Sequence, residues 1–171
     1  MTNTLSARRR PMIDSYSRVL TIVTALGAGL NAGVFFAFSS FVMTALRRLP
    51  ATQSISAMNA INKAAPTAWF MTAFVGTAIA GVVLAVSAFR RLGQPSSVYQ
   101  LAGVALYLIA FVVTVAYHVP RNDALALVDS NAAGAAQTWA HYFSGWMAWN
   151  HVRTLAALAG AACLTLSLRA D

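Results

Sequence analysis

Four long apolar stretches, separated by short polar segments, dominate the pattern along the chain. The first runs from Val19 to Leu46 without a charge and exceeds the roughly 20 residues that a helix needs to cross a bilayer. The last, Thr154 to Leu168, is too short to cross alone, so its helix must begin earlier, near Trp139. The pattern predicts a basic N-terminal tail over residues 1–18 and a membrane domain over residues 19–168, with spans at 19–46, 66–89, 98–117 and 139–168.

The ends of these spans contain residues that start or stop helices. Pro66 lies in the first turn of the second span, where a missing N–H costs little, and Pro120 closes the third. Residues 94–97 form a tight turn that joins spans two and three into a helical hairpin. Residues 57–63 have the pattern of an amphipathic helix at the membrane surface. The predicted fold is all-α: a four-helix transmembrane bundle with a short amphipathic interfacial helix in the first loop.

Composition and charge identify lipid as the solvent of most of this surface. The chain is 58% hydrophobic and only 9% charged, against about 25% charged in soluble domains. Its net charge of +8 comes mainly from short arginine clusters beside the apolar stretches. That placement is typical of contacts with lipid head groups and of topology signals, so nucleic acid is not an expected partner.

The distribution of Lys and Arg predicts an orientation. Seven of them flank the spans on the side of the two termini and four on the other side. This excess predicts a multi-pass protein of the cytoplasmic (inner) membrane with both termini in the cytoplasm, although the pair Arg47 and Arg48 argues against it. Gly27, Gly29 and Gly33 give the first span a small-residue face that fits packing within the bundle or contact with a second copy, so a homo-oligomer stays open.

Polar residues gather at one face of the membrane. The first loop, the end of span three and the start of span four lie at the same face in either orientation. Arg153 lies 15 residues before Leu168, or roughly 22 Å along the helix, which places it several ångströms inside the boundary of a core about 30 Å thick. His118 is expected at that boundary and Asn31 near the middle of span one. We therefore expect a pocket that opens into this half of the bundle.

The start of span four has an aromatic and polar stripe. At about 100° per residue, one face of the helix collects Trp139, Tyr142, Trp146, Trp149, Asn150 and Arg153. His151 points roughly opposite Tyr142. Such a stripe suits a flat aromatic ligand with oxygen atoms. The alternatives are an interfacial belt for Trp139 and Tyr142, an Arg153 side chain that reaches the head groups, and an Asn31 that bonds the backbone of another helix.

Cofactor motifs are scarce. His118, His141 and His151 could converge on a metal, but no H-x-x-x-H pair or carboxylate partner within a span supports this. There is no glycine-rich phosphate loop, nucleophile elbow or C-x-x-C motif. Cys163 is the single cysteine and lies in an apolar run, as a packing residue would. We predict no metal and no organic cofactor.

Four segments resemble the anthrone oxygenase-like family of small four-helix membrane proteins. They are residues 33–43, Ala57-Met58-x-x-Ile61-Asn62, Val119-Pro120-x-Asn122-Asp123 and Trp146-x-x-Trp149-Asn150-x-x-Arg153-Thr154. The resemblance extends over residues 27–168. Fungal members are associated with the oxidation of anthrones to anthraquinones, which implies an oxidase or oxygenase that uses O2 as co-substrate. One departure is His118, which stands where the family pattern has Asn before the Val-Pro pair.

The resemblance and the polar stripe together give the candidate site. An anthrone methylene can lose a proton, and the resulting anion can react directly with O2. His118 or His151 would be the base, Arg153 and Asn150 would stabilise the oxyanion, and Trp146 with Phe35 and Phe38 would hold the rings. The candidate catalytic residues are His118, Asn122, Asn150, His151 and Arg153. The candidate substrate-binding residues are Asn31, Phe35, Phe38, Asn62, Tyr117, Trp139, Tyr142, Trp146 and Trp149.

A non-enzymatic role is the alternative. A small-molecule binding or transport protein, or an accessory membrane subunit, would use the same pocket but tolerate loss of the histidines. Four spans are few for a transporter, and no inverted repeat is visible.

Overall fold

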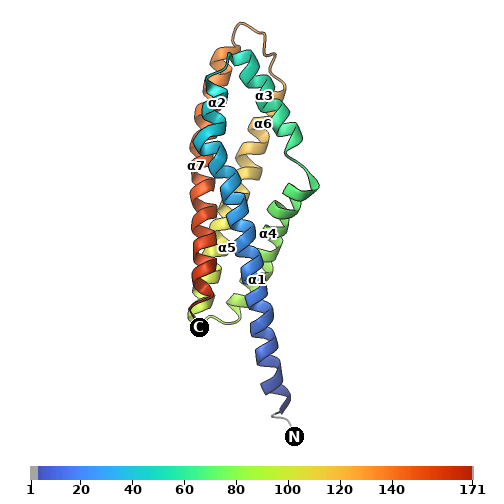
Figure 1. Cartoon of the computed structure of the whole chain (residues 1–171), viewed down its shortest axis with the longest axis vertical. Coiled ribbons are helices and arrows are strands. Elements are labelled where there is room, and N and C mark those ends of the chain that lie inside the picture. The colour runs from blue at the N-terminus through green and yellow to red at the C-terminus, as the bar shows by residue number, and fades with distance from the viewer. Residues whose placement is uncertain (1–3, 171) are drawn as a thin grey trace.

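A computed structural model describes residues 4–170, with side chains from Ser15 onward, and all its regular structure is helical (Figure 1). Two short segments, labelled η, are π-helical turns inside longer helices. The elements are α1 (Thr4–Ala37), η1 (Phe38–Val42), α2 (Met43–Arg47), α3 (Ala51–Ala64), α4 (Ala68–Phe89), α5 (Pro95–Val113), η2 (Thr114–His118), α6 (Val119–Ala126) and α7 (Ala135–Ser167).

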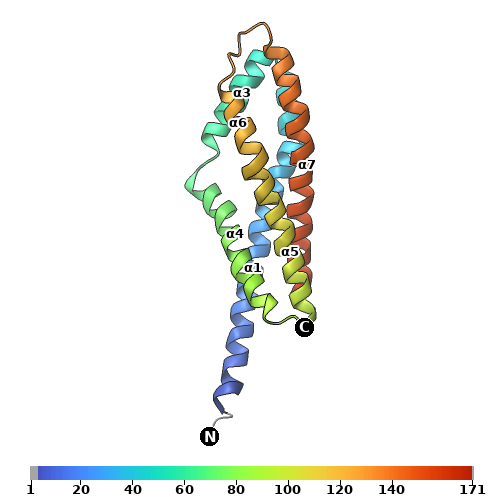
Figure 2. The ribbon, with the colours of Figure 1, turned by 180° about the vertical axis from the view of Figure 1, so that it is seen from behind.

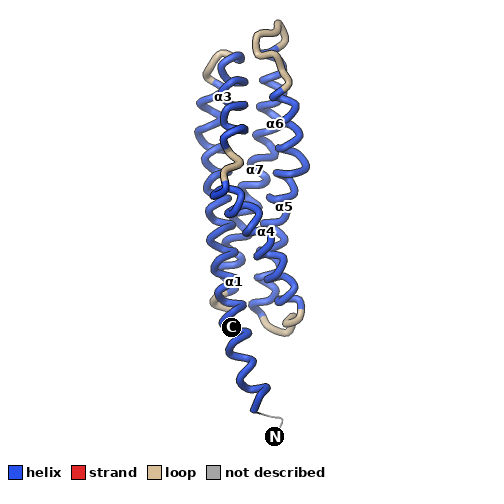
Figure 3. Tube along the Cα trace, turned by 90° about the vertical axis from the view of Figure 1, so that its right-hand side faces the viewer, coloured by secondary structure: helices blue, strands red, loops and turns tan. Residues whose placement is uncertain are grey.

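The helices form an elongated bundle. α1, η1 and α2 run as one continuous rod, α3 and α4 return, α5, η2 and α6 form a second continuous rod, and α7 returns again (Figures 1 and 2). α7 packs against α1 and α5, and α4 packs against the same two helices. The first turns of α1 extend beyond the end of the bundle (Figure 3). Two sets of loops therefore lie at opposite ends of the molecule.

Three helices are long and apolar enough to cross a membrane: Ser15–Arg47, Ala68–Phe89 and Pro95–Ala126. α7 has 33 residues, but it does not meet the same criterion within the part of the chain that the structure describes. His141, Asn150, His151 and Arg153 lower its hydropathy. α7 is nevertheless deeply packed, since Asn150, Arg153 and Thr154 are all buried.

The helix of span three continues beyond its predicted end. Pro120 does not close it, because the helix passes through η2 and ends at Ala126. A proline ring crowds the carbonyl four residues earlier and cannot donate to it. The wider turn over Thr114–His118 comes directly before this point, and the Val119 N–H reaches the Thr114 carbonyl. The prediction that Pro66 lies in the first turn of span two is also wrong, since α4 begins at Ala68 with the Thr67 hydroxyl accepting from the Phe70 N–H at 3.2 Å.

α3 belongs to the packed core. It begins at Ala51, earlier than the predicted 57, and its buried Ile55 and Met58 pack with Met43, Leu46 and Leu125. The Ser54 hydroxyl, also buried, donates to the Leu46 carbonyl at 2.8 Å. The helix expected to lie on the membrane surface is therefore held between α2, α6 and α7.

Glycines set the closest helix contacts. A Cβ on Gly160 would lie 2.8 Å from the Gly103 carbonyl oxygen, so the backbones of α5 and α7 touch at this crossing. A Cβ on Gly27 would overlap the Thr77 hydroxyl of α4. Gly29 and Gly33 have no neighbour within 4 Å of that position. Of the predicted glycine face, only Gly27 makes a close contact within the bundle.

Candidate functional site

A cavity of about 670 Å³ lies within the bundle, next to the connection between α3 and α4. α1, η1, α3, α4, the rod of α5, η2 and α6, and α7 all contribute residues to its wall. The lining residues are Val34, Phe35, Phe38, Ile61, Asn62, Ala64, Ala65, Pro66, Thr67, Phe70, Met71, Phe74, Val75, Phe111, Thr114, Val115, His118, Val119, Asn122, Trp146 and Arg153. Residues 64–67 of the lining are exposed, as are Val115 and Val119, so the cavity opens sideways between the α3–α4 connection and the rod of α5, η2 and α6.

Aromatic rings form most of the wall. Phe74 stacks with Phe111 at 4.7 Å between ring centroids and with Phe70 at 5.8 Å, and Phe35 meets Phe74 edge-on. On the side of η1, the ring centroids of Phe38 and Trp146 lie 5.5 Å apart. Flat apolar walls of this kind bind aromatic ligands through their faces and edges.

Arg153 places a guanidinium against these rings. It is only 6% exposed, and its Cζ lies 4.2 Å from the centroid of Phe35 and 5.0 Å from that of Trp146. Its Nε donates to the Asn150 Oδ1 at 2.7 Å and its Nη1 to the Thr114 hydroxyl at 3.3 Å. All these partners are neutral. The acids whose side chains the structure describes, Asp123 and Asp129, form no ion pair with it. A buried cation without a counter-charge is costly, so this site favours an anionic or oxygen-rich ligand.

Asn150 holds Arg153 in place. Its Oδ1 accepts from Arg153, and its Nδ2 donates to the Phe35 carbonyl at 2.9 Å and to the Ser39 hydroxyl at 2.7 Å. Ser39 lies in the π-helical turn η1, and Thr114 lies in η2. Both π-helical turns thus place a hydroxyl next to the Asn150–Arg153 pair. Turns of this type occur frequently at functional sites.

His118 lies at the cavity wall and is almost fully buried. Its Nδ1 lies 3.3 Å from the Val113 carbonyl oxygen and its Nε2 3.3 Å from that of Trp146, while its ring meets the Trp146 ring edge-on. Both distances exceed the usual range of about 2.7–3.2 Å, so the two contacts are weak. His118 and Arg153 are the ionisable side chains among the lining residues.

An amide cluster borders the same cavity. The Asn122 Oδ1 accepts from the Tyr142 hydroxyl at 2.8 Å and from the Trp146 indole N–H at 3.1 Å. The Asn62 Nδ2 is buried without a hydrogen-bond partner among the described residues. An unsatisfied buried donor costs about 1–3 kcal/mol. A ligand oxygen beside Asn62 would remove that cost.

The structure brings some of the predicted site residues together. Seven of them line the cavity, and Asn150 and Tyr142 contact lining residues directly. The seven are Phe35, Phe38, Asn62, His118, Asn122, Trp146 and Arg153.

Other predicted residues lie outside this cavity. His151 is exposed and its Nδ1 lies 3.0 Å from the Ser39 hydroxyl. Trp149 is 43% exposed and packs on Tyr117, with 5.3 Å between the ring centroids. Trp139 belongs to the core beyond the cavity, together with α3. Asn31 donates to the Gly27 and Ala73 carbonyls, as expected of an asparagine that bonds another helix.

Several lining residues were not predicted from the sequence. Phe70, Phe74 and Phe111 belong to helices that are apolar on every side, and nothing in their pattern separates a lipid-facing from a cavity-facing position. The position of Thr114 at the cavity depends on the π-helical turn η2, and regular helical phase does not predict such a turn. The spacing of Phe70 and Phe74 places both on one face of α4, since residues four apart share a helix face, but it does not show whether lipid or the cavity lies against that face.

Metal ligands do not gather in this region. Within the described part of the chain, no three His, Cys, Asp or Glu side chains come together to hold a metal ion. His118 is buried at the cavity, whereas His141 and His151 are exposed. The three histidines considered as a metal site therefore do not converge.

Comparison with known proteins identifies a family. The sequence model of a family described as anthrone oxygenase matches residues 67–163, more than half of the chain. The matched region contains all of α4, α5, η2 and α6, and α7 as far as Cys163, and thus His118, Asn122, Asn150 and Arg153. No curated protein and no solved structure matches the chain.

Proposed function

Because this chain belongs to the anthrone oxygenase family, we propose that it is a membrane-embedded oxidase or oxygenase that acts on an anthrone-like or other polycyclic phenolic compound with O2. One observation carries the proposal: Arg153 is buried against an aromatic cavity with only neutral partners. The cavity of about 670 Å³ falls within the range of about 300–1,000 Å³ that is common for small-molecule sites.

The first chemical step is loss of a proton. The methylene of an anthrone lies between two aromatic rings, so the electron pair left behind is delocalised onto the ring oxygen. Arg153, with the donors that it does not use for Asn150 and Thr114, stabilises that oxygen as it gains charge. His118 is the base, since it is the remaining ionisable side chain in the lining. Phe74, Phe111 and Trp146 hold the rings.

Oxygen completes the reaction. The carbanion reacts with O2, and conversion of the CH2 group to a carbonyl removes four electrons from that carbon. Two of them reduce one oxygen atom of O2 to water, and two reduce the other atom, which stays on carbon as the carbonyl oxygen. The balance is one anthrone and one O2 to one anthraquinone and one water. We propose no metal or organic cofactor for this step.

The membrane arrangement is part of the proposal. α7 would form the fourth span of the 19–168 domain, with both termini in the cytoplasm of the cell and the protein in the cytoplasmic membrane. Its contacts with α1 and α5 along the bundle support this. A lipid-soluble substrate would enter through the lateral opening at residues 64–67.

The second candidate is a binding or transport protein for the same kind of ligand. The position of His118 favours it, since both ring nitrogens face backbone carbonyl oxygens rather than open space. Such a protein would use Arg153 and the aromatic wall to hold the ligand without turnover.

The deciding experiment measures O2 uptake and anthraquinone formation by membranes that contain the protein and are supplied with a simple anthrone. We expect turnover by the wild type and a loss of about 10²–10³-fold in Arg153→Ala, since one oxyanion donor is worth that much. Arg47→Ala is the matched control, because Arg47 stacks on Phe143 outside the cavity.

Two results would contradict the enzymatic role. Equal rates in wild type, Arg153→Ala and empty membranes exclude anthrone oxidation. Binding of the anthrone without O2 uptake, lost in Arg153→Ala, establishes the binding protein instead.

A further inference from the structure

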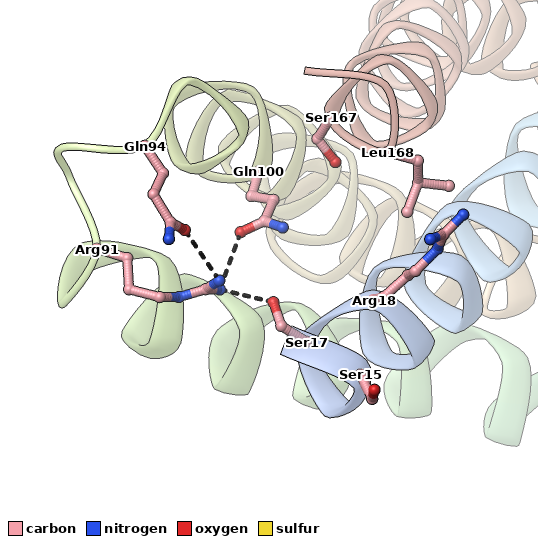
Figure 4. Close-up of a pocket in the computed structure, with 8 residues that line it drawn as sticks. All are labelled: Ser15, Ser17, Arg18, Arg91, Gln94, Gln100, Ser167 and Leu168. Carbon is pink, nitrogen blue, oxygen red and sulfur yellow. Dashed lines mark hydrogen bonds between the residues drawn. The ribbon is translucent and has the colours of Figure 1, made fainter. Parts of the chain in front are cut away.

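A second cavity, of about 450 Å³, lies at the opposite end of the bundle and has polar walls (Figure 4). Four segments meet there: residues 15–18 of α1, the turn between α4 and α5, the first turns of α5 and the C-terminal end of α7. Ser17, Arg18, Arg91, Gln100 and Ser167 are among its lining residues. Ser17, Gln100 and Ser167 are buried, so this is a built polar site rather than a surface depression.

Arg91 crosses the cavity and is held in a fixed position. Its Nη2 donates to the Ser17 hydroxyl at 2.6 Å and lies 3.5 Å from the Gln100 Oε1, and its Nη1 donates to the Gln94 Oε1 at 3.2 Å (Figure 4). Its Nε donates to the Ser87 carbonyl at 3.3 Å. Gln100 is itself fixed, because its Nε2 donates to the Thr21 hydroxyl at 3.2 Å. The guanidinium is thus oriented by neutral groups from three helices.

The positive charge of this cavity has no counter-charge in the described residues. Arg18 lines the same cavity and makes no hydrogen bond or ion pair with any side chain that the structure describes. Asp123 and Asp129 lie at the other end of the bundle, and the side chains of Asp14 and Asp171 are outside the described part. Two arginines without a counter-charge among the described residues, at one cavity, form a site for an anion with several oxygen atoms, as a phosphate has.

The surroundings point to a lipid as the source of that phosphate. The apolar helix α4 ends at Phe89, immediately before Arg90 and Arg91. Phe89 is 67% exposed, and Val19 and Val98, which lie close in sequence to the lining residues, are 61% and 60% exposed. A phospholipid would therefore place its acyl chains on these apolar faces and its head group in the cavity. Basic pockets between helices at the cytoplasmic side bind anionic head groups in this way.

We propose that this cavity binds the phosphate of an anionic phospholipid head group through Arg18 and Arg91. The bound head group would connect α1, α4, α5 and α7 at the end of the bundle remote from the aromatic cavity. The inference does not depend on the proposed oxidation, since it concerns other residues and needs no turnover.

Native mass spectrometry of the full chain in a neutral detergent tests this directly. The probes are phosphatidylglycerol, phosphatidylcholine and inorganic phosphate. We expect the wild type to retain phosphatidylglycerol over phosphatidylcholine, and Arg18→Gln with Arg91→Gln to bind it at least about tenfold more weakly, as loss of charge-assisted hydrogen bonds implies. Arg90→Gln is the matched control, because Arg90 is exposed at the same end but does not line the cavity.

Arg18→Gln alone keeps the test valid if loss of Arg91 disturbs the fold. Arg18 has no hydrogen-bond or ion-pair partner among the described side chains, so its replacement removes charge without breaking such an interaction, and weaker retention of phosphatidylglycerol supports the site. Unchanged retention in Arg18→Gln and in the double variant overturns the proposal. Complete displacement of phosphatidylglycerol by millimolar inorganic phosphate overturns the lipid as source and assigns the cavity to the free anion.

Discussion

Asn150 and Arg153 act as a unit in this protein. Asn150 is fully buried, accepts from Arg153 and donates to the backbone of α1 and to Ser39 in η1. Its amide therefore fixes the guanidinium relative to the rod of α1, η1 and α2. A buried arginine placed in this way keeps its remaining donors directed at one position without rearrangement, which is the condition for electrostatic stabilisation of a developing anion.

The two candidate bases can be separated by a matched pair of substitutions. We expect His118→Asn to lower turnover by about 10²–10⁴-fold, the usual contribution of a general base. His151→Asn should leave turnover nearly unchanged, because His151 is exposed outside the cavity. The measurement is the rate of anthrone-dependent O2 uptake at equal protein levels. Full activity of His118→Asn would show that the cavity needs no imidazole.

The residues of α7 were the most predictable part of the site. α7 is one regular helix from Ala135 to Ser167, so the spacing of Trp146, Asn150 and Arg153 fixes their common face, and all three are buried. The predicted stripe is wide enough to include Trp149, but this residue lies at the edge of the buried face of α7 and is 43% exposed. Phase alone could not decide this, because the neighbour that covers or exposes an edge residue belongs to another helix.

The helix–helix contacts depend on two glycines that the sequence pattern did not single out. Gly103 and Gly160 allow the backbones of α5 and α7 to touch, as the 2.8 Å approach of a hypothetical Gly160 Cβ to the Gly103 carbonyl oxygen shows. The pattern instead pointed to Gly27, Gly29 and Gly33, of which Gly27 contacts Thr77 closely and the other two have open space around them. A glycine predicts a close helix contact only when the helix that packs against it is known. The sequence alone does not identify that partner helix.

This crossing gives a prediction on stability. Gly160→Leu should lower the free energy of unfolding by about 1–3 kcal/mol or more, because the new side chain has to separate α5 from α7. Gly29→Leu is the control with the same change in size and should have little effect on the monomer, since no atom lies within 4 Å. Unfolding in mixed micelles, followed by circular dichroism, measures both. Equal stability of Gly160→Leu and wild type would contradict the close crossing.

The π-helical turns explain why the end of span three was misplaced. A proline in an apolar helix ordinarily ends the helix, so the sequence predicts that span three ends near Pro120. Here the helix widens over Thr114–His118 and continues to Ala126. The widened turn also sets the positions of Thr114 and His118 at the cavity. No local pattern distinguishes a proline that ends a helix from one that is accommodated by a π-helical turn.

The arrangement of the whole bundle in the membrane can be tested by labelling. In a Cys163→Ala background, Asn131→Cys in the loop before α7 should react with a membrane-impermeant maleimide from one side. Gln94→Cys, in the turn between α4 and α5, and Ala170→Cys should react from the other side, because four spans return the chain to the side of that turn. Labelling of Ala170→Cys and Asn131→Cys from the same side would exclude α7 as a fourth span.

The large architecture was predictable because lipid imposes it. Long uncharged runs in a chain with 9% charged residues have to be helical, since a helix satisfies its own backbone in lipid. The position of α3 was harder to predict, because its buried face at Ile55 and Met58 packs on α2 and α6 at one end of the bundle. An amphipathic pattern shows that a helix has an apolar side, but it does not show whether protein or lipid covers that side.

The low hydropathy of α7 has a consequence for how the protein is made. A helix with Asn150, His151 and Arg153 in its middle partitions poorly from the translocon into lipid by itself. In the proposed four-span arrangement, α7 leaves the ribosome after α1, α4 and α5 have been released. The nascent chain therefore has to assemble its first three spans and accept the fourth against them. The site that contains Arg153 is completed only after α7 has been synthesised and has packed against the earlier spans.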